Sequence, residues 1–416
     1  MSQRVLTLPP CLRGEIQLPA SKSISARALV LGALSGTREI RNLSDCEDTC
    51  VMRQALQQPP RTEVDVRAAG TAMRFLTALF ATRPDEQRLL TGTQRMRERP
   101  IGVLVQALRS LGADIEYAGK EGFPPLKICG KRLEGGLVSL PADVSSQYIS
   151  ALLMTGPLLR GGLTLHLIGE IASRPYIDMT LALMRRFGAC AEWTGERTLA
   201  VAEGGYTPLD EFCVEPDWSA ASYWYELVAL APDPATTIRL PRLSLDSLQG
   251  DHVVATMFEA LGVSTETEAN GIVLRKNGKA ALESTWEADF ADCPDLAQTL
   301  AVTCALLGKP FHFTGLQSLR IKETDRIAAL QNELAKLGLH VEASAATLTY
   351  TPQPTKATCA PPPTIATYAD HRMALAFAPA AWRHPGLRIS DPGVVAKSYP
   401  AFWSDLAHVG AKCCDI

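Results

Sequence analysis

The chain has 416 residues, too many for one ordinary hydrophobic core, so two domains of about 200 residues each are expected. Hydrophobic residues make up 46% and charged residues 20%, the balance of a well-buried globular protein. The net charge of −3 lacks the positive excess typical of nucleic-acid-binding proteins. The longest apolar run, Met373–Trp382, is too short to span a bilayer. A cytoplasmic protein that binds neither nucleic acid nor membrane is therefore expected, and residues 1–15 show no secretory signal.

The cysteines predict neither disulfides nor a metal site. There are 11 of them, an odd number, and no Cys-x-x-Cys pair occurs. Several lie in or beside apolar stretches, as small hydrophobic residues do in a reducing compartment: Cys129, Cys190, Cys213, Cys293 and Cys304.

A repeated pattern runs along the chain. Amphipathic stretches with a helical period end at a glycine and continue into short alternating segments, which is typical of a helix followed by a β-hairpin. The glycines fall 72 to 76 residues apart, at Gly112, Gly188, Gly262, Gly338 and Gly410. A second series of predicted helices begins before them, near Ser23, Gly70, Ser146, Ser219, Asp295 and His371. Self-similarity of this length indicates repeated structural units.

The two series predict six units, each strand–helix–strand–helix–hairpin. The first unit is short, because the chain reads Leu56-Gln-Gln-Pro-Pro where its hairpin is expected. Three units per lobe place the lobe boundary near Phe212–Glu215, and the opening strand Val5–Leu8 is expected to pair with the far lobe. The predicted first lobe is 14–213, and the second is 1–13 with 214–416.

Polar and charged residues occupy the first turns of the first helices in these units. Examples are Ser21-Lys22-Ser23 through Arg27, Gly70-Thr71, Ser145-Ser146-Gln147 and Asp370-His371-Arg372. A helix start presents free N–H groups and a partial positive charge, so it favours an anion. One such start alone is ordinary capping. Six in the same phase of a repeat predict a site for small anionic substrates.

Further charged clusters precede the second helices of the units. They are Arg95–Pro100, Ser173–Tyr176, Lys322–Arg326 and the segment ending at Lys397. Taken alone, Lys322-Glu323-Thr324-Asp325-Arg326 is typical of a solvated, salt-bridged first turn.

Taken in order, these motifs resemble the 5-enolpyruvylshikimate-3-phosphate (EPSP) synthase family. The matching strings span Leu18 to Pro400 and include LPASKSISARAL, AAGTAMR, RMRERPIG, SSQYISALLMTGPL, SRPYID, CPDLAQTLAV, IKETDRI, YADHRMALAF and DPGVVAKSYP. The resemblance implies an α/β fold, a two-lobed inverse α/β barrel with three βαβαββ units per lobe and the active site in the cleft between them. It also implies a monomer without metal or organic cofactor.

The activity implied by the resemblance belongs to the shikimate pathway of aromatic amino-acid biosynthesis. The enolpyruvyl group of phosphoenolpyruvate passes to the 5-hydroxyl of shikimate 3-phosphate, through a tetrahedral intermediate, and phosphate is released. Glyphosate inhibits the family by occupying the phosphoenolpyruvate site.

The resemblance also implies site residues. Those expected to bind shikimate 3-phosphate are Lys22, Ser23, Arg27, Ser145, Ser146, Gln147, Ser173, Tyr176, Asp295, Ser318 and Lys322. Those expected to bind phosphoenolpyruvate are Lys22, Gly70, Arg99, Gln147, Arg326, Arg372 and Lys397. Arginine forks suit carboxylate and phosphate. Glu323 is expected to transfer the proton at C3 of phosphoenolpyruvate, and Asp295 to partner the 5-hydroxyl with Lys22 nearby.

Some positions depart from the family pattern. Ala68 and Ser318 stand where asparagine is usual, and Phe75 where proline is usual. Two alternatives therefore stay open: the related UDP-N-acetylglucosamine enolpyruvyl transferase, and a catalytically impaired homologue that binds the substrates. The first normally has Lys-Asn where this chain has Lys22-Ser23, and a reactive cysteine that the Arg95–Pro100 region lacks. RNA-end processing on a related repeat fold is disfavoured by the acidic net charge.

Overall fold

The computed structural model describes residues 2–142, 145–280, 282–353 and 362–416. The chain forms two compact lobes, the first being Ala20–Glu215 and the second Met1–Pro19 with Pro216–Ile416. These bounds differ slightly from 14–213. Residues 14–19 fall in the second lobe because β2 (Arg13–Glu15) pairs there with β13 (Thr237–Pro241).

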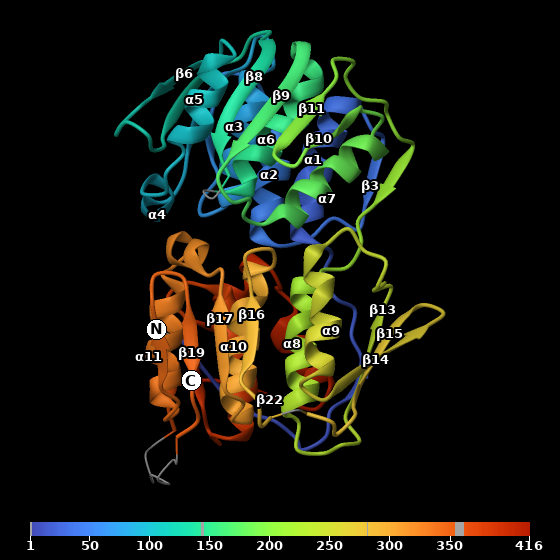
Figure 1. Cartoon of the computed structure of the whole chain (residues 1–416), viewed down its shortest axis with the longest axis vertical. Helices are drawn as coiled ribbons and strands as arrows, with labels where there is room; N and C mark the ends of the chain where they lie inside the picture. Colours follow the sequence, from blue (N-terminus) through green and yellow to red (C-terminus); the bar gives the residue numbers. More distant parts are fainter. Residues whose placement is uncertain (1, 143–144, 281, 354–361) are drawn as a thin grey trace. The chain divides into compact units, whose positions relative to one another are not determined.

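The first lobe contains three sheets (Figure 1). One has the order β4 (Thr62–Asp65), β5 (Gln87–Thr91), β7 (Leu126–Cys129), β6 (Asp114–Tyr117). The second has the order β8 (Glu134–Pro141), β9 (Arg160–Ile168), β11 (Thr198–Val201), β10 (Ala191–Gly195). The third is the parallel pair β12 (Glu211–Cys213) and β3 (Glu39–Arg41). In each four-stranded sheet the first two strands are parallel and the hairpin that follows is antiparallel.

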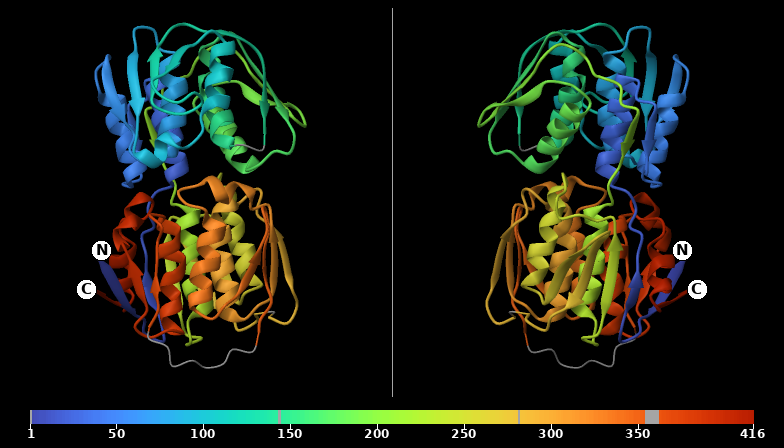
Figure 2. Two further views of the ribbon diagram at one scale, coloured as in Figure 1. Left: turned by 90° about the vertical axis from the view of Figure 1, so that its left-hand side faces the viewer. Right: turned by 90° about the vertical axis from the view of Figure 1, so that its right-hand side faces the viewer.

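Three helices form the interior of the first lobe: α1 (Lys22–Ser35), α3 (Gly70–Ala81) and α6 (Ser146–Thr155). Their sequences are mostly apolar, which favours burial, and every residue of α3 except Thr71 is buried. The sheets lie around them in Figures 1 and 2. The other helices are α2 (Glu47–Gln57), α4 (Gln94–Arg97), α5 (Gly102–Ser110) and α7 (Arg174–Arg186).

The second lobe repeats this plan with three four-stranded sheets. They are β20 (Thr364–Ile365), β21 (Arg388–Ser390), β1 (Gln3–Thr7), β22 (Lys412–Asp415); then β14 (Val263–Glu268), β15 (Gly271–Lys276), β13, β2; and β16 (Trp286–Asp289), β17 (Phe311–Thr314), β19 (Leu348–Tyr350), β18 (Val341–Ala343). The interior helices are α8 (Trp218–Leu230), α10 (Ala297–Leu307) and α12 (His371–Phe377). The other α-helices are α9 (Val254–Glu259), α11 (Arg326–Lys336) and α13 (Phe402–His408).

The predicted repeat is confirmed in the positions of the helices. The first helices of the units begin at or within three residues of the predicted points, although the fifth opens as a 3-10 turn, η3 (Pro294–Leu296). All five capping glycines have positive φ, between 75° and 106°, as a left-handed helix end requires. No strand lies between α2 and β4, so the first unit lacks its hairpin as predicted.

Two strands exchange places between the repeats. β12 directly precedes α8 in sequence but pairs with β3 of the first lobe, while β2 precedes α1 but pairs with β13 of the second. The opening strand β1 fills the inner hairpin position of the sixth unit, between β21 and β22. Each lobe therefore contains a strand that is followed in sequence by the first helix of the other lobe: β12 in the first lobe and β2 in the second.

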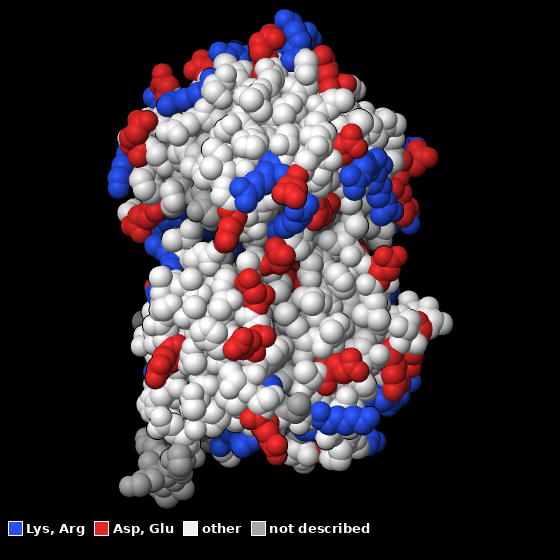
Figure 3. Space-filling model, in the orientation of Figure 1, with Lys and Arg blue, Asp and Glu red and all other residues white. Residues whose placement is uncertain are grey.

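The surface carries both signs of charge. Basic and acidic side chains are interspersed over the face shown in Figure 3. In the part of the chain that the structure describes, no helix is both long and apolar enough to cross a bilayer.

Glu226 is a carboxylic acid inside the second lobe, on α8. Its side chain is 0% exposed, and neither carboxyl oxygen has a hydrogen-bond partner among the described residues. The nearby Thr303 hydroxyl donates to the carbonyl of Thr299 instead, at 2.7 Å. Burial raises the pKa of Glu226 well above its ordinary value. The Thr303 hydroxyl lowers this pKa, but by less than burial raises it. The folded protein therefore favours the protonated form of Glu226 more strongly than the unfolded chain does.

We expect Glu226→Gln to stabilise the protein, and more so as pH rises. Above the ordinary carboxyl pKa the unfolded chain ionises more readily than the folded protein, so wild-type stability falls with increasing pH. Glutamine has no carboxyl proton to lose, so the variant lacks this dependence of stability on pH. Thermal unfolding at pH 5 and pH 8 measures the difference, with exposed Glu287→Gln on β16 as the control. An advantage that is equal at both pH values would contradict the argument.

Candidate active site

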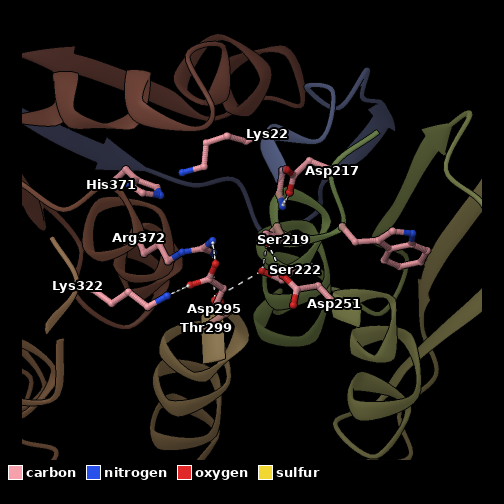
Figure 4. Close-up of polar contacts among 12 residues, drawn as sticks. Lys22, Asp217, Ser219, Ser222, Asp251, Asp295, Thr299, Lys322, His371 and Arg372 are labelled. Atoms are coloured by element: carbon pink, nitrogen blue, oxygen red, sulfur yellow. Dashed lines mark hydrogen bonds and ion pairs between the residues drawn. The ribbon is translucent and has the colours of Figure 1, made fainter. Parts of the chain in front are cut away.

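Asp295 is the centre of a charged cluster at the starts of the interior helices of the second lobe. Its Oδ1 lies 3.1 Å from Nη1 of Arg326 and 3.7 Å from Nζ of Lys322. Its Oδ2 lies 2.9 Å from Nη2 of Arg372. Figure 4 shows the Asp295 carboxylate between Lys322 and Arg372. Three cations around one carboxylate fix its orientation.

Arg326 links three carboxylates. Its Nε donates to Asp370 at 2.7 Å, its Nη1 to Asp295 at 3.1 Å and its Nη2 to Glu323 at 2.9 Å. The residue is only 1% exposed. Burial alone would lower the pKa of Arg326, but the neighbouring carboxylates outweigh it and raise that pKa. Arg326 is thus a permanent cation at the core of the cluster.

Arg372 makes three contacts besides its ion pair with the Asp295 carboxylate. Its Nη1 donates to the Asp295 carbonyl at 3.0 Å and to the Tyr223 hydroxyl at 3.2 Å. Its backbone N–H donates to Asp370, the residue that caps α12. Burial raises the pKa of Tyr223 to about 12, so this phenol is neutral at ordinary pH.

Asp251 lies beside the cluster and accepts a hydrogen bond from the Ser219 hydroxyl (Figure 4). Burial, reinforced by the negative charge of Asp295, raises the pKa of Asp251 to about 7. It therefore gains or loses a proton near neutral pH. Such a group in a charged cluster is typical of functional sites.

The remaining predicted residues of the second lobe surround this cluster. Lys322 and Glu323 are partly exposed between η4 (Gln317–Ile321), which contains Ser318, and α11. Burial lowers the pKa of Lys322, and the charge of Asp295 opposes it. Lys397 ends η6 (Pro392–Lys397), and its Nζ donates to the Ala369 carbonyl at 2.7 Å.

In the first lobe, Arg27 is buried, and its guanidinium donates to other groups of the protein. It is 2% exposed. Nε donates to Thr180 at 2.7 Å, Nη1 to the Ser23 carbonyl at 2.9 Å, and Nη2 to Ser150 at 3.0 Å and the Tyr176 carbonyl at 3.2 Å. Its guanidinium also lies 5.4 Å from the centre of the Phe75 ring. Burial lowers the pKa of Arg27 to about 10.

The other first-lobe residues are partly exposed at the helix starts. Lys22 begins α1, with its Nζ 3.6 Å from Asp48, and Ser21 rather than Ser23 caps the helix. Ser145 caps α6 through the N–H of Gln147, and Gln147 Nε2 donates to the Thr71 hydroxyl at 3.2 Å. The remaining members are Ser23, Ser146, Ser173 and Tyr176. The helix starts of α3 and α6 thus meet, as the repeat predicted.

Gly70 and Arg99 are in close contact. A Cβ on Gly70 would lie 2.6 Å from Nη1 of Arg99, closer than real side chains approach. The glycine therefore lets the guanidinium rest against the first turn of α3. The Arg99 guanidinium is at the end of a flexible side chain, so it can move aside if a larger residue replaces Gly70.

If Gly70 and Arg99 bind phosphoenolpyruvate, as the resemblance implies, Gly70→Ala should displace Arg99 and raise the KM for this substrate by about 3- to 30-fold, the scale of one weakened charged hydrogen bond. Glyphosate inhibition should weaken as well. The melting temperature should hardly change, because only a side-chain end must move. Steady-state kinetics with Gly195→Ala, where a Cβ meets only Thr198 at 3.9 Å, provide the control. An unchanged KM for phosphoenolpyruvate in Gly70→Ala would contradict this.

Sequence reasoning missed Asp251 and Tyr223 as parts of the cluster, and it placed Asp370 at a helix start of the expected site without giving it a role. Asp251 lies just before the second helix of its unit, the repeat position that Ser173 and Lys322 occupy in theirs. The repeat could therefore have found it. Tyr223 carried no such signal, because it looks like core on α8. Among the described residues, no group of three or more His, Cys, Asp or Glu side chains is arranged to hold a metal ion.

Comparisons with known proteins agree with this geometry. The family model "EPSP synthase (3-phosphoshikimate 1-carboxyvinyltransferase)" matches residues 7–60 and 53–406. A 3-phosphoshikimate 1-carboxyvinyltransferase of Bacteroides fragilis (strain YCH46) is 53% identical over 409 residues, covering 98% of this chain and 97% of the relative. Its counterpart from Cellvibrio japonicus (strain Ueda107) is 40% identical over 423 residues, covering 95% and 97%.

A solved structure shares the fold. It is an EPSP synthase from Acinetobacter baumannii, with a TM-score of 0.79, 20% identity and full coverage of both chains. At that identity the likeness concerns the fold alone, and it confirms the α/β class that the resemblance implied. The family match and the 53% identical relative together cover nearly the whole chain. The chain therefore belongs to the EPSP synthase family, whose members are transferases.

Proposed function

We propose that this chain transfers the enolpyruvyl group of phosphoenolpyruvate to the 5-hydroxyl of shikimate 3-phosphate and releases phosphate. The observation that carries the proposal is the arrangement of Asp295 and Glu323, two partly exposed carboxylates held 3.1 and 2.9 Å from the same buried guanidinium. The reaction needs two proton-transfer groups beside strong positive charge. The alternative acceptor, UDP-N-acetylglucosamine, is not favoured by relatives named for 3-phosphoshikimate.

Glu323 is proposed to transfer the proton at C3 of phosphoenolpyruvate. Its carboxylate accepts a hydrogen bond from Nη2 of Arg326 at 2.9 Å, and its side chain is 20% exposed. It is thus fixed in place and still open to a ligand. Protonation at C3 leaves positive charge at C2, which the attacking hydroxyl then neutralises to give the tetrahedral intermediate.

Asp295 is proposed to orient the 5-hydroxyl, with Lys22 sharing the movement of protons. Elimination returns a proton from C3 and expels phosphate from C2. The leaving phosphate gains negative charge, so nearby cations stabilise the transition state. Those proposed to bind phosphoenolpyruvate are Lys22, Arg99, Arg326, Arg372 and Lys397, together with Gly70 and Gln147.

Shikimate 3-phosphate is proposed to bind hydroxyl, amide and ammonium donors, with Asp295 accepting from a substrate hydroxyl. The donors are Lys22, Ser23, Ser145, Ser146, Gln147, Ser173, Tyr176, Ser318 and Lys322. Arg27 is proposed to act on this substrate by holding Ser23 and Tyr176, since its hydrogen bonds go to protein acceptors. We further propose a cytoplasmic monomer. In support, ten described cysteines are free thiols, as in a reducing compartment.

The test is an assay with both substrates that measures phosphate and the enolpyruvyl ether together. We expect one phosphate for each ether formed, and neither product when either substrate is omitted. Tight binding of shikimate 3-phosphate without turnover would favour the catalytically impaired alternative. Turnover only with UDP-N-acetylglucosamine would favour the other.

A further inference from the structure

Glu333 is a buried carboxylate on α11 that the reaction does not use. Its side chain is 0% exposed. Its Oε2 accepts from Nζ of Lys336 at 2.6 Å and from the backbone N–H of Ala366 at 2.9 Å, and its Oε1 accepts from the Tyr368 hydroxyl at 2.7 Å. Two of these three donors belong to the segment that leads into α12. Glu333 therefore ties α11 to that segment.

The segment that it holds has an unfavourable backbone conformation. Tyr368 and Ala369 are consecutive non-glycine residues with φ of 54° and 53°. Non-glycine residues rarely adopt this left-handed conformation, and it persists only where the surroundings hold it. The Tyr368 hydroxyl is well suited to the task, because burial and the hydrogen bond to Glu333 raise the pKa of Tyr368 and keep the donor protonated.

The same segment supplies hydrogen-bond acceptors to three cations of the proposed phosphoenolpyruvate site. The Ala369 carbonyl accepts from Nζ of Lys397 at 2.7 Å. The next residue, Asp370, accepts from Arg326 at 2.7 Å and from the backbone N–H of Arg372 at 2.9 Å. A shift of this segment would therefore move all three cations that the second lobe supplies to that site.

We propose that Glu333, with the Ala366 amide and the Tyr368 hydroxyl, forms a latch that positions Arg326, Arg372 and Lys397 for phosphoenolpyruvate. Glu333 is a positioning residue, since it acts through the segment 366–370 and not on substrate. Arg326 and Glu333 lie seven residues apart on α11, two turns along one face. The helix thus contacts the segment through two side chains, Arg326 at Asp370 and Glu333 at Ala366 and Tyr368. This inference rests on the proposed function.

The test uses two variants. Glu333→Gln places an amide N–H₂ against groups that are themselves donors, and Tyr368→Phe removes only the hydroxyl from a residue that is 38% exposed. We expect the KM for phosphoenolpyruvate to rise about tenfold or more in Glu333→Gln and about 3- to 10-fold in Tyr368→Phe, as expected for losing charged hydrogen bonds. The KM for shikimate 3-phosphate should change less than twofold. Exposed Glu342→Gln on β18 is the matched control.

Hydrogen exchange gives the readout that a general loss of stability would not produce. Amides 366–372 should exchange faster in both variants, while those of β17 and α10 stay unchanged. Equal rises in both KM values, or an unchanged KM for phosphoenolpyruvate in Tyr368→Phe, would overturn the latch. Failure of the proposed function is distinguishable, because wild-type protein would then release no phosphate from the two substrates.

Discussion

Glu323→Gln is expected to lower turnover by about 10²–10⁴, the range measured when a general acid–base group is removed. The amide keeps the shape of the side chain, and its oxygen can still accept from Nη2 of Arg326, the contact now 2.9 Å long. It cannot carry a proton to C3 of phosphoenolpyruvate. Single-turnover kinetics and calorimetric binding of shikimate 3-phosphate measure the two effects separately.

The control for this variant is Glu342→Gln, the same chemical change at an exposed position of the same lobe. It should leave turnover unchanged. Near-normal turnover in Glu323→Gln would remove Glu323 from the mechanism. A loss of shikimate 3-phosphate affinity as large as the loss of turnover would make Glu323 a binding group instead.

Arg326→Ala is expected to unfold the second lobe partly as well as to abolish activity. Arg326 is 1% exposed and donates to Asp295, Glu323 and Asp370. Its removal leaves these carboxylates facing one another, and breaking a buried ion pair costs about 3–5 kcal/mol. This exceeds the cost of losing one ligand contact, which is the effect expected at Arg372.

Denaturant unfolding of both variants provides the measurement. Arg372→Ala should weaken phosphoenolpyruvate binding by about 1.5–3 kcal/mol, the scale of a charged hydrogen bond, with a smaller loss of stability. If Arg326→Ala has the unfolding midpoint of the wild type, the three carboxylates do not depend on this guanidinium, and the description of the cluster is wrong.

Periodicity predicted much of the fold because the helices of each unit can be identified from their own residues. A helix such as α11 needs only its amphipathic spacing and its final glycine, Gly338, to be found. The exchange of β2 and β12 could not be found this way. Both are three-residue strands, and the choice of a parallel partner depends on packing that the sequence nearby does not encode.

The site was predictable only in part. Residues such as Lys322 and Arg372 stand in motifs at a fixed phase of the repeat, so pattern and resemblance both select them. Whether such a side chain contacts a ligand or another part of the protein depends on tertiary packing. Arg27 was expected to bind substrate, yet its donors go to Ser150, Thr180 and two carbonyls. Only packing decides whether a guanidinium faces a ligand or the core.

One reaction run in D₂O tests the central claim, that a protein group adds a proton at C3 and later removes one. Purified chain is mixed with both substrates for a single turnover, and the product is analysed by mass spectrometry. During the tetrahedral intermediate C3 is a methyl group, so the account predicts an enolpyruvyl ether with deuterium in its methylene group, and phosphate in equal amount. An ether without deuterium, or phosphate released without any ether, would contradict it.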